Sequence, residues 1–452
     1  MSTSLIVFLV ISAVALLLFM VLKLKLSAFI ALLLTSVYVG IVAGMPLTNI
    51  TKAIQEGMAG TLGFVATVVG LGAIFGQMLE SSGGAESLAR YLIKKFGTDR
   101  ASWAMVITGF VVAIPVFLDV AFIILVPIIY ALARDTKRSL LYYGIPLLAG
   151  LAVTHSFVPP TPGPIAVTEI LGAQMGWVIL FGIILGFPIA IIAGPVWGKY
   201  ISKKIFLEPP AEYNQLQNKD YDEKNLPPFG MIAIIIAIPL FLILLNTFTG
   251  LAVSKDILPK SVLTDVLEFI GHPFSALIIA TLIAIYFLCV KRGMGKQKIL
   301  DLSTKALGPA GIIILITGAG GVLKQILVDS GMGKMMAESM AGSALPPILL
   351  AWILAAVVRV TQGSATVAMI TAAGIIAPVL EEFALNDPQR ALVVLAIASG
   401  ATLLSHVNDS GFWLVGKYLG MNEKQTLQSW TVMETIIALC GLAFTLLASL
   451  FF

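Results

Sequence analysis

The sequence predicts an all-α polytopic membrane protein made of two inverted repeats, each with a re-entrant helical hairpin and a broken transmembrane helix. Three observations predict this fold. Of 452 residues, 58% are hydrophobic and 12% are charged, whereas about 25% of the residues in a soluble domain are charged. Apolar runs of roughly 20 residues, long enough to cross a membrane, recur along the chain. Finally, one set of motifs occurs in both halves.

The repeated motifs lie in the same order in each half. The segment 72–84 (GAIFGQMLESSGG) matches 320–333 (GGVLKQILVDSGMG). Further along, Asp119 aligns with Thr366 and His155 with His406. Polar, non-helical sequence follows each histidine. Matching interruptions in two halves of a membrane chain indicate the substrate site of a secondary transporter.

The spans themselves follow from apolar runs. Continuous spans are predicted at 4–22, 26–46, 59–80, 173–202, 229–247, 268–290, 306–328 and 429–451. Two longer apolar segments, 101–134 and 345–382, each have a weak helical centre, at Ala113-Ile114-Pro115 and at Thr361-Gln362-Gly363-Ser364. We expect both to be re-entrant hairpins, since non-helical backbone at membrane depth needs protein or a water-filled cavity around it. Broken spans follow at 140–171 and 390–420.

The distribution of Lys and Arg predicts orientation and domains. If neither hairpin crosses fully and the N-terminus lies outside, most of these residues fall in inside loops, as the positive-inside rule requires. Both termini then lie on the outer side of the cell membrane, and the two halves are inverted copies of each other. The domains are scaffold spans 1–58, a first repeat 59–204, a cytoplasmic linker 205–228, scaffold spans 229–305 and a second repeat 306–452.

Four motifs resemble the gluconate permease family of the ion transporter superfamily. They are FLDVAF at 117–122, THSFVPPTPGP at 154–164, QGSATVA at 362–368 and SHVNDSGFW at 405–413. The resemblance runs from about residue 4 to the C-terminus. It implies proton-coupled uptake of gluconate or a related sugar acid, with D-serine and glycerate among members' substrates. It also implies a homodimer in which a transport part moves as an elevator against a scaffold.

The candidate substrate-binding residues lie at these interruptions. They are Asp119, His155, Ser156, Thr161, Arg359, Gly363, Ser364, Thr366, Asn408, Asp409 and Ser410. A hairpin tip with hydroxyls near a helix N-terminus suits a carboxylate, and short amide and carboxylate side chains suit hydroxyl groups. Structural alternatives stay open. Asp119 could cap a half-helix, the prolines at 159–164 could only fix a bend, and Arg359 could pair with Asp409 rather than with substrate.

Four titratable residues are candidates for proton coupling: Asp119, His155, His406 and Asp409. A carboxylate at membrane depth is costly unless paired, hydrated or protonated, and imidazole titrates near neutral pH. The proton is the coupling ion expected. No cofactor or metal is predicted, because Cys289 and Cys440 lie singly in apolar runs. No basic stripe indicates nucleic acid; the partners expected are a small carboxylate and the lipid bilayer.

The sequence therefore favours a secondary active transporter for a small hydroxylated monocarboxylate, gluconate first, and not an enzyme. D-serine, glycerate or another sugar acid are alternative substrates. A sodium-coupled carrier of di- or tricarboxylates and a membrane-embedded enzyme are less favoured. The four buried titratable residues argue against the sodium-coupled carrier. The duplication of the polar breaks in both halves argues against the enzyme.

Overall fold

The computed structural model describes residues 3–209, 226–332 and 346–452, and within these ranges the chain is helical and contains no β-strand. The predicted all-α membrane fold is confirmed. Among the described residues, seven helices or runs of consecutive helices are long and apolar enough to cross a membrane. They are Leu47–Ser81, Leu141–Ile170, Met175–Lys204, Phe229–Ser254, Pro273–Arg292, Lys296–Asp329 and Glu423–Phe451. Most of the predicted linker 205–228, namely residues 210–225, lies outside the described residues.

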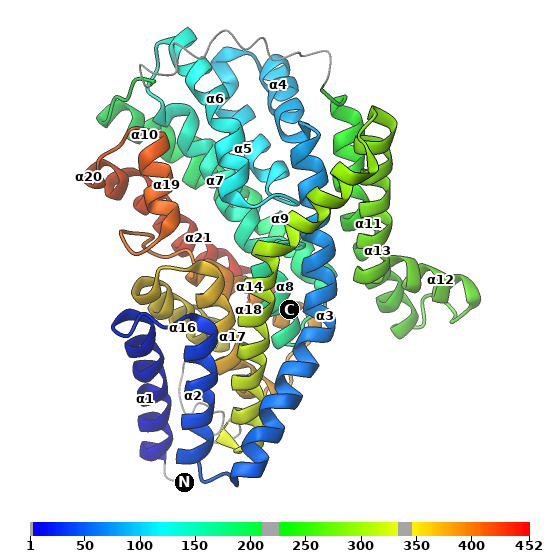
Figure 1. Ribbon diagram of the computed structural model, residues 1–452, viewed down its shortest axis with the longest axis vertical. Coiled ribbons are helices and arrows are strands. Elements are labelled where there is room, and N and C mark those ends of the chain that lie inside the picture. Colours follow the sequence, from blue (N-terminus) through cyan, green and yellow to red (C-terminus); the bar gives the residue numbers. More distant parts are fainter. Residues whose placement is uncertain (1–2, 210–225, 333–345) are drawn as a thin grey trace.

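The two longest described helices lie side by side through the length of the molecule. α3 (Leu47–Ser81, 35 residues) and α14 (Lys296–Asp329, 34 residues) pack against each other (Figure 1). At 1.5 Å per residue each is about 50 Å long, which exceeds the ~30 Å hydrocarbon core. They touch where side chains are small, because a Cβ atom on Gly57 would lie 2.6 Å from the carbonyl oxygen of Gly321. Both begin before the spans predicted at 59–80 and 306–328.

The remaining helices that occupy predicted continuous spans are close to the expected ranges. α1 (Thr3–Leu22) and α2 (Ala28–Val42) fall in the first two, and α11 (Phe229–Ser254) in 229–247. The span 173–202 holds α9 (Met175–Ile191), η2 (Ile192–Val196) and α10 (Trp197–Lys204). The span 268–290 holds α13 (Pro273–Ala284) and η5 (Ile285–Cys289), and 429–451 holds η7 (Leu427–Thr431) and α21 (Val432–Ala448). The helices α4 (Gly84–Phe96) and α20 (Glu423–Thr426) and most of α12 (Val262–Gly271) lie outside the predicted spans.

The two predicted hairpin segments are both interrupted near their expected centres. α5 (Ala101–Val112) and α6 (Leu118–Thr136) are separated by residues 113–117, and both pack against α7. α16 (Pro347–Gln362) and α17 (Ala365–Glu381) are separated by residues 363–364 and pack against each other. Gly363 has φ +85°, a left-handed conformation that favours glycine.

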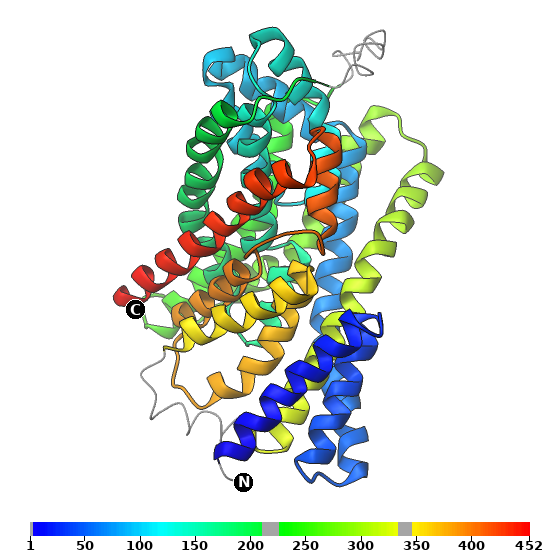
Figure 2. The ribbon, with the colours of Figure 1, turned by 90° about the vertical axis from the view of Figure 1, so that its left-hand side faces the viewer.

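The two predicted broken spans are also interrupted. α7 (Leu141–Phe157) and α8 (Pro162–Ile170) are separated by residues 158–161, where Pro159 and Pro160 lack the amide N–H that a continuing helix needs. α18 (Asp387–Gly400) and α19 (Ser410–Tyr418) are separated by residues 401–409. Figure 2 shows this second break, in orange, beside the yellow α16.

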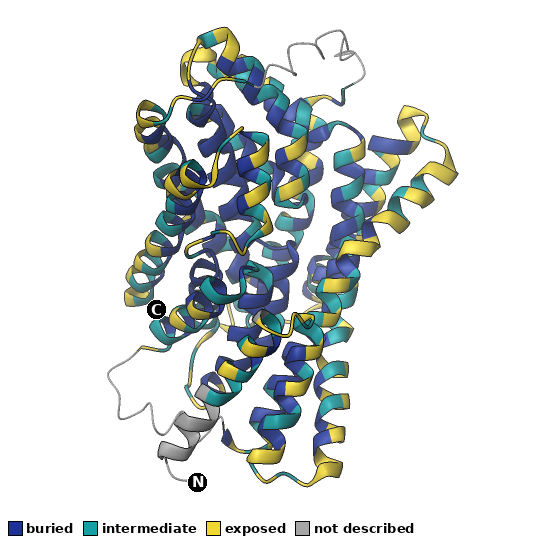
Figure 3. Ribbon diagram, turned by 60° about the vertical axis from the view of Figure 1, so that its left-hand side comes forward, coloured by how far each residue is buried: buried dark blue, intermediate teal, exposed yellow. Residues whose placement is uncertain are grey.

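Burial is concentrated around these interrupted helices. In Figure 3, buried positions fill the interior, and exposed positions lie along the outer faces of the long helices. α7 is buried on nearly all sides, and 89% of the apolar window in Leu141–Ile170 lies inside the protein. A helix that is apolar all round and buried all round lies at the centre of a helical protein. The break that follows α7 therefore lies in the protein interior.

Candidate functional site

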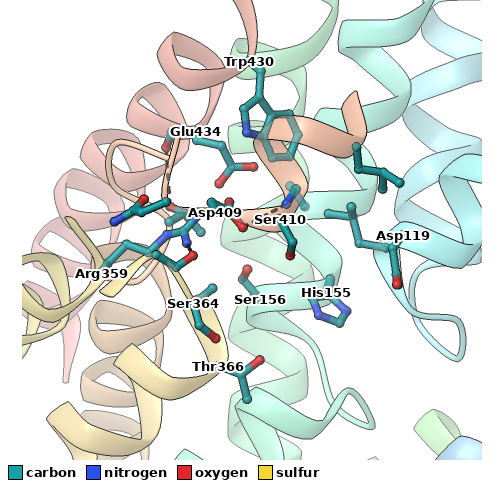
Figure 4. A pocket seen from close by; sticks show the side chains of 18 of the residues that line it. Asp119, His155, Ser156, Arg359, Ser364, Thr366, Asp409, Ser410, Trp430 and Glu434 are labelled. Atoms are coloured by element: carbon teal, nitrogen blue, oxygen red, sulfur yellow. Dashed lines mark hydrogen bonds and ion pairs between the residues drawn. The ribbon is translucent and has the colours of Figure 1, made fainter. Parts of the chain in front are cut away.

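The chain breaks of both halves meet at one cavity of about 460 Å³ (Figure 4). This volume is within the range of pockets that hold small molecules. Its lining residues are Leu118, Asp119, Ala152, His155, Ser156, Arg359, Gln362, Gly363, Ser364, Ala365, Thr366, Thr402, Asn408, Asp409, Ser410, Gly411, Leu414, Trp430 and Glu434. Of the eleven residues that the sequence predicts for substrate binding, ten line this cavity, and Thr161 does not.

Helix ends point to the cavity from several directions. The first residues of α6, α17 and α19 line it, as do the last residues of α7 and α16. The first N–H groups of a helix have no partner within that helix, and the macrodipole there is positive. Three helix N-termini that end at one cavity therefore favour an anion. The side chains of Ser364 and Asp409 cap two of them, by accepting from Val367 N (3.4 Å) and Gly411 N (2.9 Å).

Arg359 and Asp409 form a buried ion pair at one wall. The Arg359 Nη2 donates to Asp409 Oδ2 at 2.6 Å, and the two side chains are 3% and 13% exposed. Arg359 Nη1 also donates to the Gly363 carbonyl, and the Ser405 hydroxyl donates to Asp409. A buried guanidinium needs an anion, and here Asp409 supplies it. Of the two roles that the sequence leaves open for Arg359, the structure displays the ion pair.

The second break is attached to the end of α16 by two side chains. His406 Nε2 donates to the Val360 carbonyl at 2.9 Å, and Asn408 Nδ2 donates to the same carbonyl at 2.9 Å. The last carbonyls of a helix lack partners within it, so these bonds satisfy groups that the α16–α17 break leaves free. His406, although predicted for proton coupling, is not among the residues that line the cavity.

The first half supplies fewer side chains to the site. Asp119 is exposed, in the first turn of α6, and makes no side-chain capping bond there. His155 and Ser156 lie in the last turn of α7, and the His155 ring packs edge-on to Phe117 with centroids 6.0 Å apart. Thr161 is buried, and its hydroxyl donates to the Val158 carbonyl at 2.7 Å. That bond holds the bend instead of reaching the cavity.

Several buried polar atoms at the cavity have no hydrogen-bond partner among the residues that the structure describes. They are Arg359 Nε, Gln362 Oε1 and His155 Nδ1. Buried polar atoms in folded proteins are normally hydrogen-bonded, and exceptions need an explanation. A polar ligand in the cavity would supply partners for atoms of this kind. Their mixture of donor and acceptor suits a molecule that carries both hydroxyls and a carboxylate.

Four polar or aromatic lining residues are not predicted from the sequence: Gln362, Thr402, Trp430 and Glu434. Trp430 and Glu434 lie at the start of the last span. The single carboxyl group of Glu434 within this apolar run is a usable signal, whereas nothing local distinguishes Trp430. Gln362 adjoins the predicted Gly363, so its place in the third motif is a usable signal. Trp430 Nε1 donates to Ser405 Oγ at 2.7 Å and thereby extends the Arg359–Asp409 network.

Comparison with known proteins identifies relatives over the whole chain. The family model described as GntP family permease matches residues 4–451. The low-affinity gluconate transporter of Escherichia coli (strain K12) is 42% identical over 98% of this chain and 97% of its own length. A gluconate permease of Pseudomonas aeruginosa is 42% identical over 95% and 94%. The Gnt-II system L-idonate transporter of E. coli (strain K12) is 38% identical over 95% and 96%.

Solved structures of other transporters share the fold. The crystal structure of the Alcanivorax borkumensis YdaH transporter aligns with a TM-score of 0.64 over 92% of this chain and 96% of that chain, at 12% identity. Neisseria gonorrhoeae MtrF, from a class of antimetabolite efflux pumps, aligns with a TM-score of 0.62 over 88% and 83%, at 15% identity. At these identities the likeness concerns the fold alone.

Proposed function

From the premise that this chain belongs to the GntP permease family, we propose that it takes up gluconate or a related sugar acid together with protons. Membership of a family of membrane permeases agrees with a transporter and not with a membrane-embedded enzyme. The relatives named above are transporters of gluconate and of L-idonate. Both acids are six-carbon monocarboxylates with a hydroxyl on each of the other five carbons, so the substrate class is a polyhydroxylated monocarboxylate.

The observation that carries this proposal is the convergence of three helix N-termini and the unpartnered Gln362, His155 and Arg359 atoms on one cavity. The N-termini of α6, α17 and α19 provide the partial positive charge that a carboxylate needs. Ser364, Thr366 and Ser410 offer hydroxyls there, and Asn408 offers an amide. These groups can exchange hydrogen bonds with the substrate's own hydroxyls.

Charge balance in the cavity supports coupling to protons. Its one guanidinium, Arg359, is already paired with Asp409. Asp119 and Glu434 add two further carboxyl groups. A substrate anion that entered with both of these ionised would meet like charges in a confined site, which is unfavourable. Taking up a proton with the anion removes that repulsion. Asp119, His155 and Asp409 are the predicted proton-coupling residues that line the cavity, and His406 does not line it.

The architecture and location that we propose follow the sequence. The halves are inverted repeats in the cell membrane, both termini lie outside, and the linker 205–228 is cytoplasmic. The segments 101–134 and 345–382 enter and leave on the same side. The protein works as a homodimer whose scaffold, formed by 1–58 and 229–305, supports a moving transport part. The interruption of four segments near one cavity supports alternating access around a central site.

Uptake into proteoliposomes tests the proposal. Purified protein is reconstituted, and accumulation of labelled gluconate is measured under an imposed proton gradient, an imposed sodium gradient, or neither. We expect accumulation above the external concentration with the proton gradient alone. Accumulation driven by sodium alone would contradict proton coupling. Absence of gluconate exchange in all conditions, with exchange of a different acid such as D-serine or glycerate, would contradict the substrate assignment.

A further inference from the structure

Glu434 is a buried carboxyl group at the wall of the cavity. It is the third residue of α21 and is 4% exposed. Figure 4 shows its carboxyl group pointing into the cavity toward Asp409 and Ser410. It lines the same cavity as Arg359 and Ser364. A side chain in this position can contact a bound substrate.

The carboxyl group of Glu434 has no partner within the described part of the chain. No hydrogen bond or ion pair of its side chain occurs there. The Thr402 hydroxyl donates to its backbone carbonyl at 3.4 Å and not to its carboxyl group. An ionised carboxylate that is buried and unpaired is costly. Either a proton or a ligand that donates to it would remove that cost.

The charged groups around Glu434 do not supply a free cation. α16 contributes Arg359, which is held by Asp409. α7 contributes His155, and Asp119 of α6 lines the same cavity. The other helices packed against α21 add no charge near this end. α9, η2, η7 and η8 (Ser449–Phe451) contain no titratable residue, and those of α18 (Asp387 and Arg390) are in its first turn, whereas Thr402, beyond its last turn, meets Glu434.

Three of the four residues predicted for proton coupling are less suited than Glu434. Asp119 is exposed, so water can stabilise its charge. Asp409 is paired with Arg359, and His406 Nε2 is committed to the Val360 carbonyl. His155 remains, with its Nδ1 unpartnered, and it is the rival that an experiment must separate from Glu434.

We propose that Glu434 is the residue that carries the coupled proton and, when protonated, donates a hydrogen bond to the bound sugar acid. This inference rests on the proposed proton-coupled transport and names the residue that performs it. With the cavity open to the outside, a proton from water binds a Glu434 carboxylate oxygen and the substrate anion binds beside it. Inside, both leave, and the carboxylate is restored. The proton and the anion therefore favour each other's binding.

The sign of the pH effect follows from this scheme. The substrate binds the protonated form of Glu434 better than the ionised form, so its affinity is greatest at low pH. Above the titration of the empty site, affinity falls as pH rises, by up to about tenfold per pH unit for one coupled proton. A residue that can no longer be ionised removes this dependence.

The test compares Glu434→Gln with unmodified protein by measuring the gluconate binding constant from acidic to mildly alkaline pH. Glutamine keeps the size of the side chain and an N–H donor. We expect Glu434→Gln to bind gluconate with an affinity that no longer changes with pH. In proteoliposomes, exchange of gluconate should continue at a reduced rate, while accumulation driven by a proton gradient should be lost. Glu434→Asp, which can still titrate, should accumulate gluconate to a lower level than unmodified protein.

Matched variants make the outcome specific. Glu169→Gln changes a half-buried glutamate of α8 that lies outside this cavity, and it should leave pH dependence and accumulation unchanged. His155→Gln should keep pH-dependent binding. Unaltered pH dependence in Glu434→Gln, or its loss in His155→Gln alone, would overturn the assignment to Glu434. If unmodified protein exchanges gluconate but a proton gradient never drives accumulation, the proposed coupling to protons is wrong. The assignment of the coupled proton to Glu434 is then wrong as well.

Discussion

Arg359 and Asp409 join the break between α16 and α17 to the break between α18 and α19, with Nη2 2.6 Å from Oδ2. The Gly363 carbonyl also accepts from Arg359, so the guanidinium ties the tip of the hairpin to the second broken span. The pair therefore shapes the wall of the cavity. The guanidinium Nε has no hydrogen-bond partner in the described ranges of the chain.

Breaking this pair should destabilise the protein. Asp409→Asn leaves the Arg359 charge buried without its anion, and such a change costs about 3–5 kcal/mol. We expect a clear fall in the thermal unfolding midpoint of the purified protein in detergent. Glu56→Gln is the control, because its ion pair with Lys52 is exposed (51% and 72%) and a surface pair contributes at most about 1 kcal/mol. Equal midpoints for the two variants would contradict a structural role for the buried pair.

The hydroxyls at the start of α17 should contribute to carboxylate binding. A hydrogen bond to a charged group contributes about 1.5–3 kcal/mol, so Ser364→Ala and Thr366→Val should each weaken gluconate binding roughly tenfold or more. The binding constant is measured by isothermal titration. Thr161→Val is the control, since Thr161 bonds to Val158 and does not line the cavity. If only Thr161→Val weakened binding, the carboxylate would lie at the α7–α8 break.

Asp119 should bind substrate without carrying the proton. Its carboxylate is exposed in the first turn of α6, where the helix macrodipole favours negative charge, and it can accept from a substrate hydroxyl. Asp119→Asn removes one charge-assisted hydrogen bond, so affinity should fall roughly tenfold at low pH. The slope of affinity against pH should be retained. If Asp119→Asn lost the dependence of affinity on pH, the coupled proton would be assigned to Asp119 instead of Glu434.

Much of this site could be predicted from sequence because chain breaks have local causes. Pro159 and Pro160 remove backbone donors, and Gly363 allows a positive φ, so these breaks have sequence signals. For Glu434 the signal is only its charge within an apolar run, which does not say which other residues it faces. Its place in the same cavity as Arg359 depends on the packing of α21 against α16. The early starts of α3 and α14 have another cause: their first turns are polar, and hydropathy marks the membrane, not the helix.

Gly363 should tolerate no side chain. Its φ of +85° is unfavourable for other residues, and a Cβ atom there would lie 2.2 Å from the carbonyl oxygen of Asn408. Gly363→Ala should therefore cost about 1–3 kcal/mol from backbone strain alone, and more because Asn408 must move. The variant should show a lower thermal unfolding midpoint and weaker gluconate binding.

Gly311→Ala provides the matched control for Gly363→Ala. Gly311 lies inside α14, and no atom outside its own stretch of helix lies within 4 Å of the position that a Cβ atom would take. Alanine is favoured over glycine in a helix interior by roughly 0.5–1 kcal/mol. We expect the midpoint of Gly311→Ala to be unchanged or raised and its gluconate affinity to match that of unmodified protein. Because both variants add one methyl group, their difference isolates the strained position of Gly363 against Asn408. If Gly363→Ala bound gluconate normally, the two breaks would not need to touch for the cavity to form.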